Sequence, residues 1–228
     1  MSELWREKAS FKRLEEEWRT KADILPYERL YETLTQAQLP ELLRDAKRLH
    51  WQVLDLHRCG LEALPPELGN LPDLQFLDLG NGKWKNDKFK QSKENTFSVL
   101  PDSFGNLSNL QSLYLGRTPI TSLPDSFGNL SNLQTLYLID TQITSLPDSF
   151  GNLSNLQSLY LDNTLITSLP DSFGNLSNLQ GLDLKLTPIT TFPDSFGNLS
   201  NLQWLDLKLT RITTLPDFFG NLSNLRGL

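Results

Sequence analysis

Side chains capable of chemistry are few in this sequence. His50 and His57 are the only histidines and Cys59 is the only cysteine, and imidazole and thiolate groups are common ligands of zinc. With a single cysteine beside them, the two histidines do not make up the ligand set of a structural or catalytic metal site. The sequence therefore predicts no metal centre.

Two aspartates offer the other possible chemistry, general acid–base catalysis. Asp183 and Asp206 occupy equivalent places in successive repeats of the sequence, so they could come together as a carboxyl pair. An open surface, however, neither excludes water nor raises the pKa of a carboxyl group. No G-x-S-x-G, H-E-x-x-H or phosphate-binding Walker sequence is present. We predict that the chain is not an enzyme and has no catalytic residue and no cofactor.

The composition argues against further classes of protein. No apolar segment approaches the roughly 20 residues that span a membrane, and the charged N-terminus lacks the apolar centre of a signal peptide. A single cysteine excludes an intrachain disulfide bond. The net charge of −6 disfavours nucleic acid, whose phosphates require a positive surface. We expect a cytoplasmic protein with no membrane or nucleic-acid partner, and its oligomeric state stays open.

The elements that would position a site come from a repeat. A Leu-Pro or Phe-Pro step recurs every 23 residues, at Leu100, Leu123, Leu146, Leu169, Phe192 and Leu215. Each unit contains the pattern L-x-x-L-x-L-x-x-T-x-I, and two diverged units begin at Trp51 and Leu74. The pattern resembles that of leucine-rich repeat proteins, in which a unit of about 20–29 residues forms one coil of a solenoid. The resemblance covers about residues 50–228, as seven repeats and the start of an eighth.

The fold class implied is an α/β solenoid. In an L-x-L segment the leucines point to one face of a short strand and the residue between them, such as Tyr114, points to the other. Parallel strands are expected to form a sheet on the concave side of a curved array, with a short helical or 3₁₀ turn on the convex side in each PDSFG segment. Gly105 is expected to end its turn in the left-handed conformation. Because one unit cannot bury its leucines alone, neighbouring coils share a core.

The letters that repeat without change are assigned structural roles. The phenylalanines are predicted to stack as an internal spine, formed by Phe104, Phe127, Phe150, Phe173, Phe196 and Phe219. The resemblance implies that a second column hydrogen-bonds the backbone of the adjacent turn, where the family usually has Asn or Cys. That column consists of Thr118, Thr141, Thr164, Thr187 and Thr210. Cys59 fills the same place in the first unit and is expected to be a buried structural thiol.

The flanks of the array break the repeat. Residues 1–50 carry apolar stripes at helical spacing and are expected to form a helical cap before the array of residues 51–228. An insertion at about 81–99 carries five lysines interleaved with Trp84, Phe89 and Phe97; it is either a solvated loop or a site for an acidic partner or a nucleic-acid strand. The sequence stops inside an expected strand with no capping unit, so we expect a fragment of a longer protein.

The letters that vary predict a binding surface. They gather in the strand and just after it, at positions expected to face solvent on the concave side. Tyr and Trp are enriched at binding hot spots, and charged neighbours set register. We predict that a protein or peptide ligand binds at Tyr114, Tyr137, Tyr160, Asp183, Lys185, Trp204, Asp206 and Lys208. The alternative is that Tyr is simply a good strand residue and that the Asp and Lys side chains neutralise one another.

These patterns favour a non-enzymatic module, or scaffold, for protein–protein interaction. The segments LLRDAKRLHWQVLDL and EALPPELGNLPDLQFLDL resemble bacterial multi-domain leucine-rich repeat proteins such as the Roco class, in which an array precedes a GTPase domain. That resemblance implies an alternative, a regulatory arm of a larger signalling enzyme whose catalytic domain lies beyond residue 228. The substrate-recruiting half of a ubiquitin-ligase effector fits less well, because those repeats are shorter.

Overall fold

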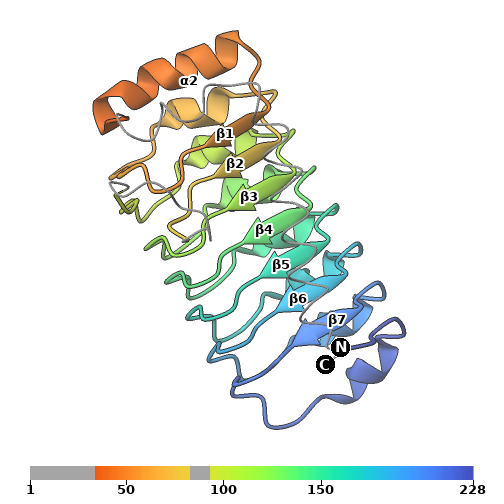
Figure 1. The fold of residues 1–228 in the computed structure, drawn as a ribbon. Coiled ribbons are helices and arrows are strands. Elements are labelled where there is room, and N and C mark those ends of the chain that lie inside the picture. The colour runs from red at the N-terminus through yellow and green to blue at the C-terminus, as the bar shows by residue number, and fades with distance from the viewer. Residues whose placement is uncertain (1–33, 83–92, 228) are drawn as a thin grey trace, which may run out of the picture.

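The computed structural model describes residues 34–82 and 93–227. These residues form seven parallel strands in one open sheet, whose spatial order follows the order of the chain (Figure 1). The strands are β1 (Val53–Asp55), β2 (Phe76–Asp78), β3 (Ser112–Tyr114), β4 (Thr135–Tyr137), β5 (Ser158–Tyr160), β6 (Gly181–Asp183) and β7 (Trp204–Asp206). Each residue pairs with its equivalent in the next coil, as Leu136 does with Leu159. A column of the repeat is therefore also a column of the sheet.

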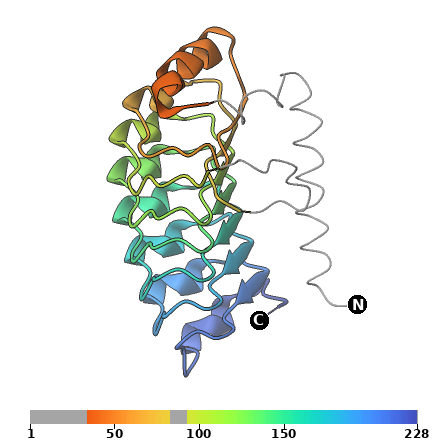
Figure 2. The ribbon, with the colours of Figure 1, turned by 60° about the vertical axis from the view of Figure 1, so that its left-hand side comes forward.

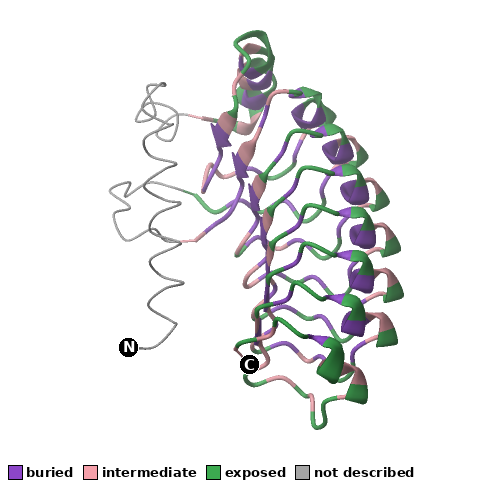
Figure 3. Cartoon of the chain, turned by 90° about the vertical axis from the view of Figure 1, so that its right-hand side faces the viewer, coloured by how far each residue is buried: buried purple, intermediate pink, exposed green. Residues whose placement is uncertain are grey.

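A 3₁₀ turn follows each of the seven strands and lies on the side of the coil opposite the sheet (Figure 2). The turns are η3 (Pro66–Asn70), η4 (Asp102–Asn106), η5 (Asp125–Asn129), η6 (Asp148–Asn152), η7 (Asp171–Asn175), η8 (Asp194–Asn198) and η9 (Asp217–Asn221). Figure 3 shows them along the outer curve, with their buried side facing the strands. The α/β solenoid, with its sheet on the concave side, is confirmed.

A short helical segment covers the first coil. It consists of η2 (Gln36–Gln38) and α2 (Leu39–Arg48), and Leu39, Leu43 and Ala46 are buried within the common core. The rest of the predicted N-terminal cap, residues 1–33, lies outside the described residues. Most of the lysine-rich insertion (83–92) and Leu228 also lie outside them.

The phenylalanine column forms the predicted spine. From Phe104 to Phe196 every ring is fully buried, and neighbouring ring centroids lie 6.1–6.3 Å apart with the planes within 8° of parallel. Burying a Phe or Leu side chain contributes roughly 1.5–3 kcal/mol. Here each inner ring of the spine packs between the rings of the two adjacent coils. Phe219 continues the stack from the last turn but is only half-buried.

The glycine of each turn has a different role from the one predicted. Gly105 is not left-handed, and among the described glycines only Gly60 has a positive φ. A β-carbon on Gly105 would instead overlap the carbonyl oxygen of Ser126 in the next coil. Glycine is needed here because neighbouring turns pack backbone to backbone. Apart from His50, which follows α2, the described left-handed residues other than Gly60 lie three places beyond a strand: Arg58, Arg117, Asp140, Asn163, Leu186 and Leu209.

The threonine column also differs from the prediction. Thr141 Oγ1 donates to the carbonyl oxygen of Leu138 at 2.7 Å, within its own coil, and the equivalent threonines do the same. A single hydroxyl reaches the carbonyl three residues back and is then used. A repeated side-chain bond between coils is made instead by the Asn of the Ser-Asn-Leu segments. Asn132 Nδ2, for example, donates to the carbonyl oxygen of Ser108 at 2.8 Å, and Asn155, Asn178, Asn201 and Asn224 repeat the bond.

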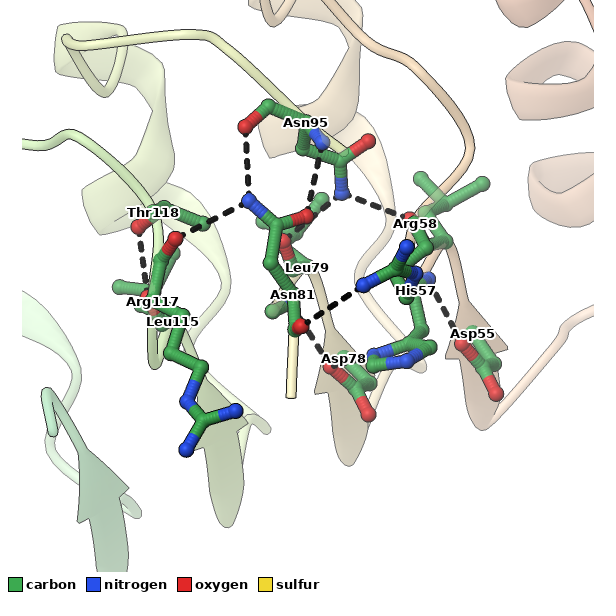
Figure 4. A network of polar contacts seen from close by, with 12 residues as sticks. Asp55, His57, Arg58, Asp78, Leu79, Asn81, Asn95, Leu115, Arg117 and Thr118 are labelled. Atoms are coloured by element: carbon green, nitrogen blue, oxygen red, sulfur yellow. Dashed lines mark hydrogen bonds and ion pairs between the residues drawn. The ribbon is translucent and has the colours of Figure 1, made fainter. Parts of the chain in front are cut away.

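One residue beside the insertion performs the bridging role that was expected of the threonines. Asn95 occupies the place of Thr118, and its Nδ2 donates to the carbonyl oxygens of Leu56 (2.9 Å) and Leu79 (2.8 Å) (Figure 4). Phe97, two residues on, is fully buried in the core. The residues added to the repeat therefore fall between Asn81 and Asn95, inside the range of about 81–99 given by the sequence.

Candidate binding surface

Five aromatic rings lie side by side across the concave face, and we call them the aromatic row. They are Phe76, Tyr114, Tyr137, Tyr160 and Trp204. Successive ring centroids are 5.0, 4.3, 4.4 and 5.7 Å apart, and the three tyrosines are close to parallel. The parallel register of β3, β4 and β5 places the tyrosines one above another.

The two ends of the row come from another column. Phe76 and Trp204 begin their strands, whereas the tyrosines end theirs. Both positions project from the same face of the sheet because side chains alternate along a strand. Trp204 has room to reach Tyr160 because its partner in the register is Gly181, where a β-carbon would overlap the indole ring. Phe76 was not among the predicted binding residues; its pairing with a small residue, Ser112, is the signal that could have indicated it.

Burial divides the aromatic row and corrects one prediction. Tyr114 and Tyr137 do not face solvent, because 8% and 4% of their surfaces are exposed. The ring of Tyr137 lies between two other rings, so both of its faces are covered. Burial raises the pKa of both phenols above the ordinary tyrosine value. Phe76, Tyr160 and Trp204 are half-buried and keep surface that a partner could contact.

The aspartates at the strand ends have a structural bond in common. Oδ1 of Asp183 accepts the amide hydrogen of Lys185, and Oδ1 of Asp206 accepts that of Lys208, both at 2.9 Å. Asp55 and Asp78 do the same at 2.8 Å. The second oxygen of Asp206 pairs with Lys208 Nζ at 3.3 Å. Part of this charge is thus neutralised internally, as the alternative interpretation expected.

The two predicted lysines differ. Lys185 is half-buried and forms no ion pair with any described residue, whereas Lys208 is exposed and paired. Asp162 occupies the place equivalent to Lys185 in the preceding coil. It was not among the predicted binding residues. Burial, and then the charge of Asp140, raises the pKa of Asp162 to about 6. The last three strands therefore present Tyr160, Trp204 and mixed charges together.

The first two strands hold a buried polar group that the sequence analysis also missed. Burial, and then the charge of Asp78, raises the pKa of Asp55 well above its ordinary value. The imidazole Nδ1 of His57 lies 3.8 Å from Asp78 Oδ1. The positions of Asp55 and Asp78 in the repeat did not predict this raised pKa, because the shift depends on how deeply the two side chains are buried.

No reactive centre follows from this polar group. Burial raises the pKa of the Cys59 thiol, and Sγ lies 3.6 Å from the carbonyl oxygen of His57. A raised pKa disfavours the thiolate, which is the nucleophilic form. Cys59 is half-buried, and the other histidine, His50, pairs with Asp73 at 2.8 Å. Within 34–82 and 93–227, no group of three or more His, Cys, Asp or Glu side chains could hold a metal ion.

Sequence models of two kinds match the chain. A model of a leucine-rich repeat region matches residues 88–185, and a model of the leucine-rich repeat matches residues 50–71. No curated protein sequence matches it. Among the described helices, none combines the length and the apolar character that crossing a bilayer requires.

Several solved structures are similar to the chain. The LRR ectodomain of the plant membrane receptor kinase GASSHO1/SCHENGEN3 from Arabidopsis thaliana, in complex with CASPARIAN STRIP INTEGRITY FACTOR 2, is 29% identical with a TM-score of 0.58. That match covers 77% of this chain and 23% of the other. The plant peptide hormone receptor RGFR1, in complex with RGF2, is 27% identical with a TM-score of 0.52, over 72% of this chain and 29% of the other.

An internalin from Listeria monocytogenes shares the fold at 21% identity, with a TM-score of 0.63. The match covers 84% of this chain and 54% of the internalin. The chain thus spans about a quarter of the two plant receptors and about half of the internalin.

Proposed function

We propose, since this chain belongs to the leucine-rich repeat proteins, that its concave surface binds a segment of another protein. The role is that of a non-enzymatic interaction module. The segment would cross β5, β6 and β7, with Tyr160 and Trp204 as anchors and Asp183, Lys185 and Lys208 fixing its register.

One observation carries the proposal. Tyr160 and Trp204, which keep exposed surface at one end of the aromatic row, adjoin the charged ends of β6 and β7. Large rings that are partly desolvated and rimmed by charge are typical of binding hot spots. The buried half of the row, Tyr114 and Tyr137, would support these anchors rather than contact the partner.

Two similar proteins support a protein or peptide as the partner. GASSHO1/SCHENGEN3 and the peptide hormone receptor RGFR1 were solved in complexes. Both are more than 25% identical to this chain, so the similarity extends to the sequence as well as to the fold. We carry over only the class of partner, a protein or peptide.

The test is affinity capture with the full chain as bait, quantified by mass spectrometry. Trp204→Ser and Tyr160→Ser remove the anchors, and Asp148→Ser on the exposed side of η6 is the matched control. Proteins recovered by the original chain and the control, but lost from both anchor variants, are the expected result. Equal recovery by all four baits would contradict binding on the concave face.

Two finer predictions from the sequence stay predictions. No described residue bears on the regulatory arm of a GTPase-type signalling enzyme or on a cytoplasmic location.

A further inference from the structure

Two exposed leucines lie side by side next to the proposed binding surface, and we call them the leucine pair. Leu186 and Leu209 follow β6 and β7 by three residues, and 43% and 74% of their surfaces are exposed. The amide of Leu186 donates to the carbonyl oxygen of Lys208 at 2.9 Å, which places the two leucines on neighbouring backbones. The leucine pair thus continues the strands that carry Asp183, Trp204 and Asp206.

The backbone conformation of the leucine pair is unfavourable for leucine. The φ angles of Leu186 and Leu209 are 61° and 59°, in the left-handed region that Gly, Asn and Asp tolerate and bulky residues avoid. Earlier coils have polar residues at this place, among them Asp140 and Asn163. Asn163 Nδ2 donates to Asp140 Oδ1 at 2.7 Å there. Compared with Asp or Asn at this place, leucine is disfavoured by the left-handed backbone conformation and gains nothing from contact with water.

Two cations flank the leucine pair. Lys185 directly precedes Leu186, and Arg211 lies two residues beyond Leu209 and is exposed. Neither side chain forms an ion pair within the part of the chain that the structure describes, whereas Lys208 pairs with Asp206. An apolar surface beside two positive charges is complementary to an apolar side chain with acidic neighbours.

We propose that the leucine pair receives a bulky apolar side chain of the bound peptide, and that acidic residues next to it face Lys185 and Arg211. This inference rests on the proposed function and specifies its ligand, a segment in which a bulky apolar residue has acidic neighbours. Trp204 and Tyr160 hold the rest of the segment. The conformational cost at Leu186 and Leu209 is then maintained for binding and not for stability.

The experiment selects phage-displayed random dodecapeptides against the full chain and measures the enriched peptides by fluorescence anisotropy. The expected peptides carry Leu, Ile, Phe or Met beside Asp or Glu. The double variant Leu186→Asn, Leu209→Asn should weaken their binding by at least about tenfold, since even one desolvated apolar contact is worth about 1.4 kcal/mol. Asn tolerates the left-handed conformation, as Asn163 shows, so thermal denaturation should find the double variant at least as stable as the original chain.

Two further variants complete the design. Leu165→Asn is the control, because Leu165 is 53% exposed in the preceding coil but is not left-handed; its affinity should stay within about twofold. Lys185→Gln should reduce the preference for acidic peptides over their amide counterparts. Peptides that depend on Trp204 but not on the leucine pair would overturn this inference and leave the proposed function standing. Peptides that depend on neither, or no enrichment at all, would overturn both.

Discussion

The indole ring of Trp204 lies against Gly181 of the neighbouring strand, in the space that a β-carbon would occupy. The two residues are register partners in β6 and β7. The missing side chain at Gly181 is what lets Trp204 lean across its neighbour toward Tyr160, 5.7 Å away between ring centroids. A glycine in the binding surface thus positions an aromatic anchor two strands from the ring that it meets.

Gly181→Ala should displace the indole of Trp204 from Tyr160. Overpacking of this kind costs about 1–3 kcal/mol of stability, and the chiral packing of the indole should change. Near-ultraviolet circular dichroism and urea denaturation measure the two effects. Trp204→Phe in the Gly181→Ala background should restore most of the lost stability, because the smaller ring no longer meets the new methyl group. Unchanged spectra for Gly181→Ala would contradict the observed contact.

The turn glycines should tolerate alanine according to whether another turn packs on them. A β-carbon on Gly151 would overlap the carbonyl oxygen of Ser172, whereas one on Gly220 meets nothing within 4 Å. Gly151→Ala should therefore lower the free energy of unfolding by about 1–3 kcal/mol, and Gly220→Ala should leave it nearly unchanged or raise it slightly. Urea denaturation of both variants checks this. Equal effects would mean that turn conformation, not packing, requires glycine.

Asn95 should matter more than any threonine of the repeat. Asn95→Ala removes donors from the carbonyls of Leu56 and Leu79 and an acceptor from the amide of Leu61. Each buried group left unpaired costs about 1–3 kcal/mol, so the loss should be several times that of Thr141→Val, which removes one bond. Chemical denaturation ranks the two. Similar losses would argue that the bridges of Asn95 do not stabilise the first coils.

Asp162 should make stability depend on pH. Its pKa is raised from 3.8 to about 6, chiefly by burial. The folded state then holds the proton more tightly than the unfolded state, so ionisation destabilises the fold progressively as pH rises between these two values. Asp162→Asn, which stays neutral, should be more stable than the original chain above pH 6, and the difference should vanish below the lower value. Thermal denaturation across this range tests it; a difference that is constant with pH would contradict the raised pKa.

The structure shows why some sequence predictions held and others did not. The Phe104–Phe196 spine and the parallel register follow from a strict 23-residue period, because coils of equal length place each residue next to the equivalent residue of the following repeat. The exposure of Tyr114 and Tyr137 was predicted wrongly, since alternation along a strand gives the face of a side chain but not how deeply the folded chain buries it. Asn95 escaped notice because the inserted residues hid its place in the repeat.

The sequence alone therefore determined the solenoid, its sheet and the columns that vary, since each follows from a period that can be counted. Only the tertiary structure decided which side chains of those columns remain available. In the folded chain Tyr114 and Tyr137 are buried while Tyr160 and Trp204 stay partly open, and the path of the backbone places Leu186 and Leu209 in left-handed, exposed positions. The physical reason is that burial and backbone conformation depend on contacts between coils, which no single repeat specifies.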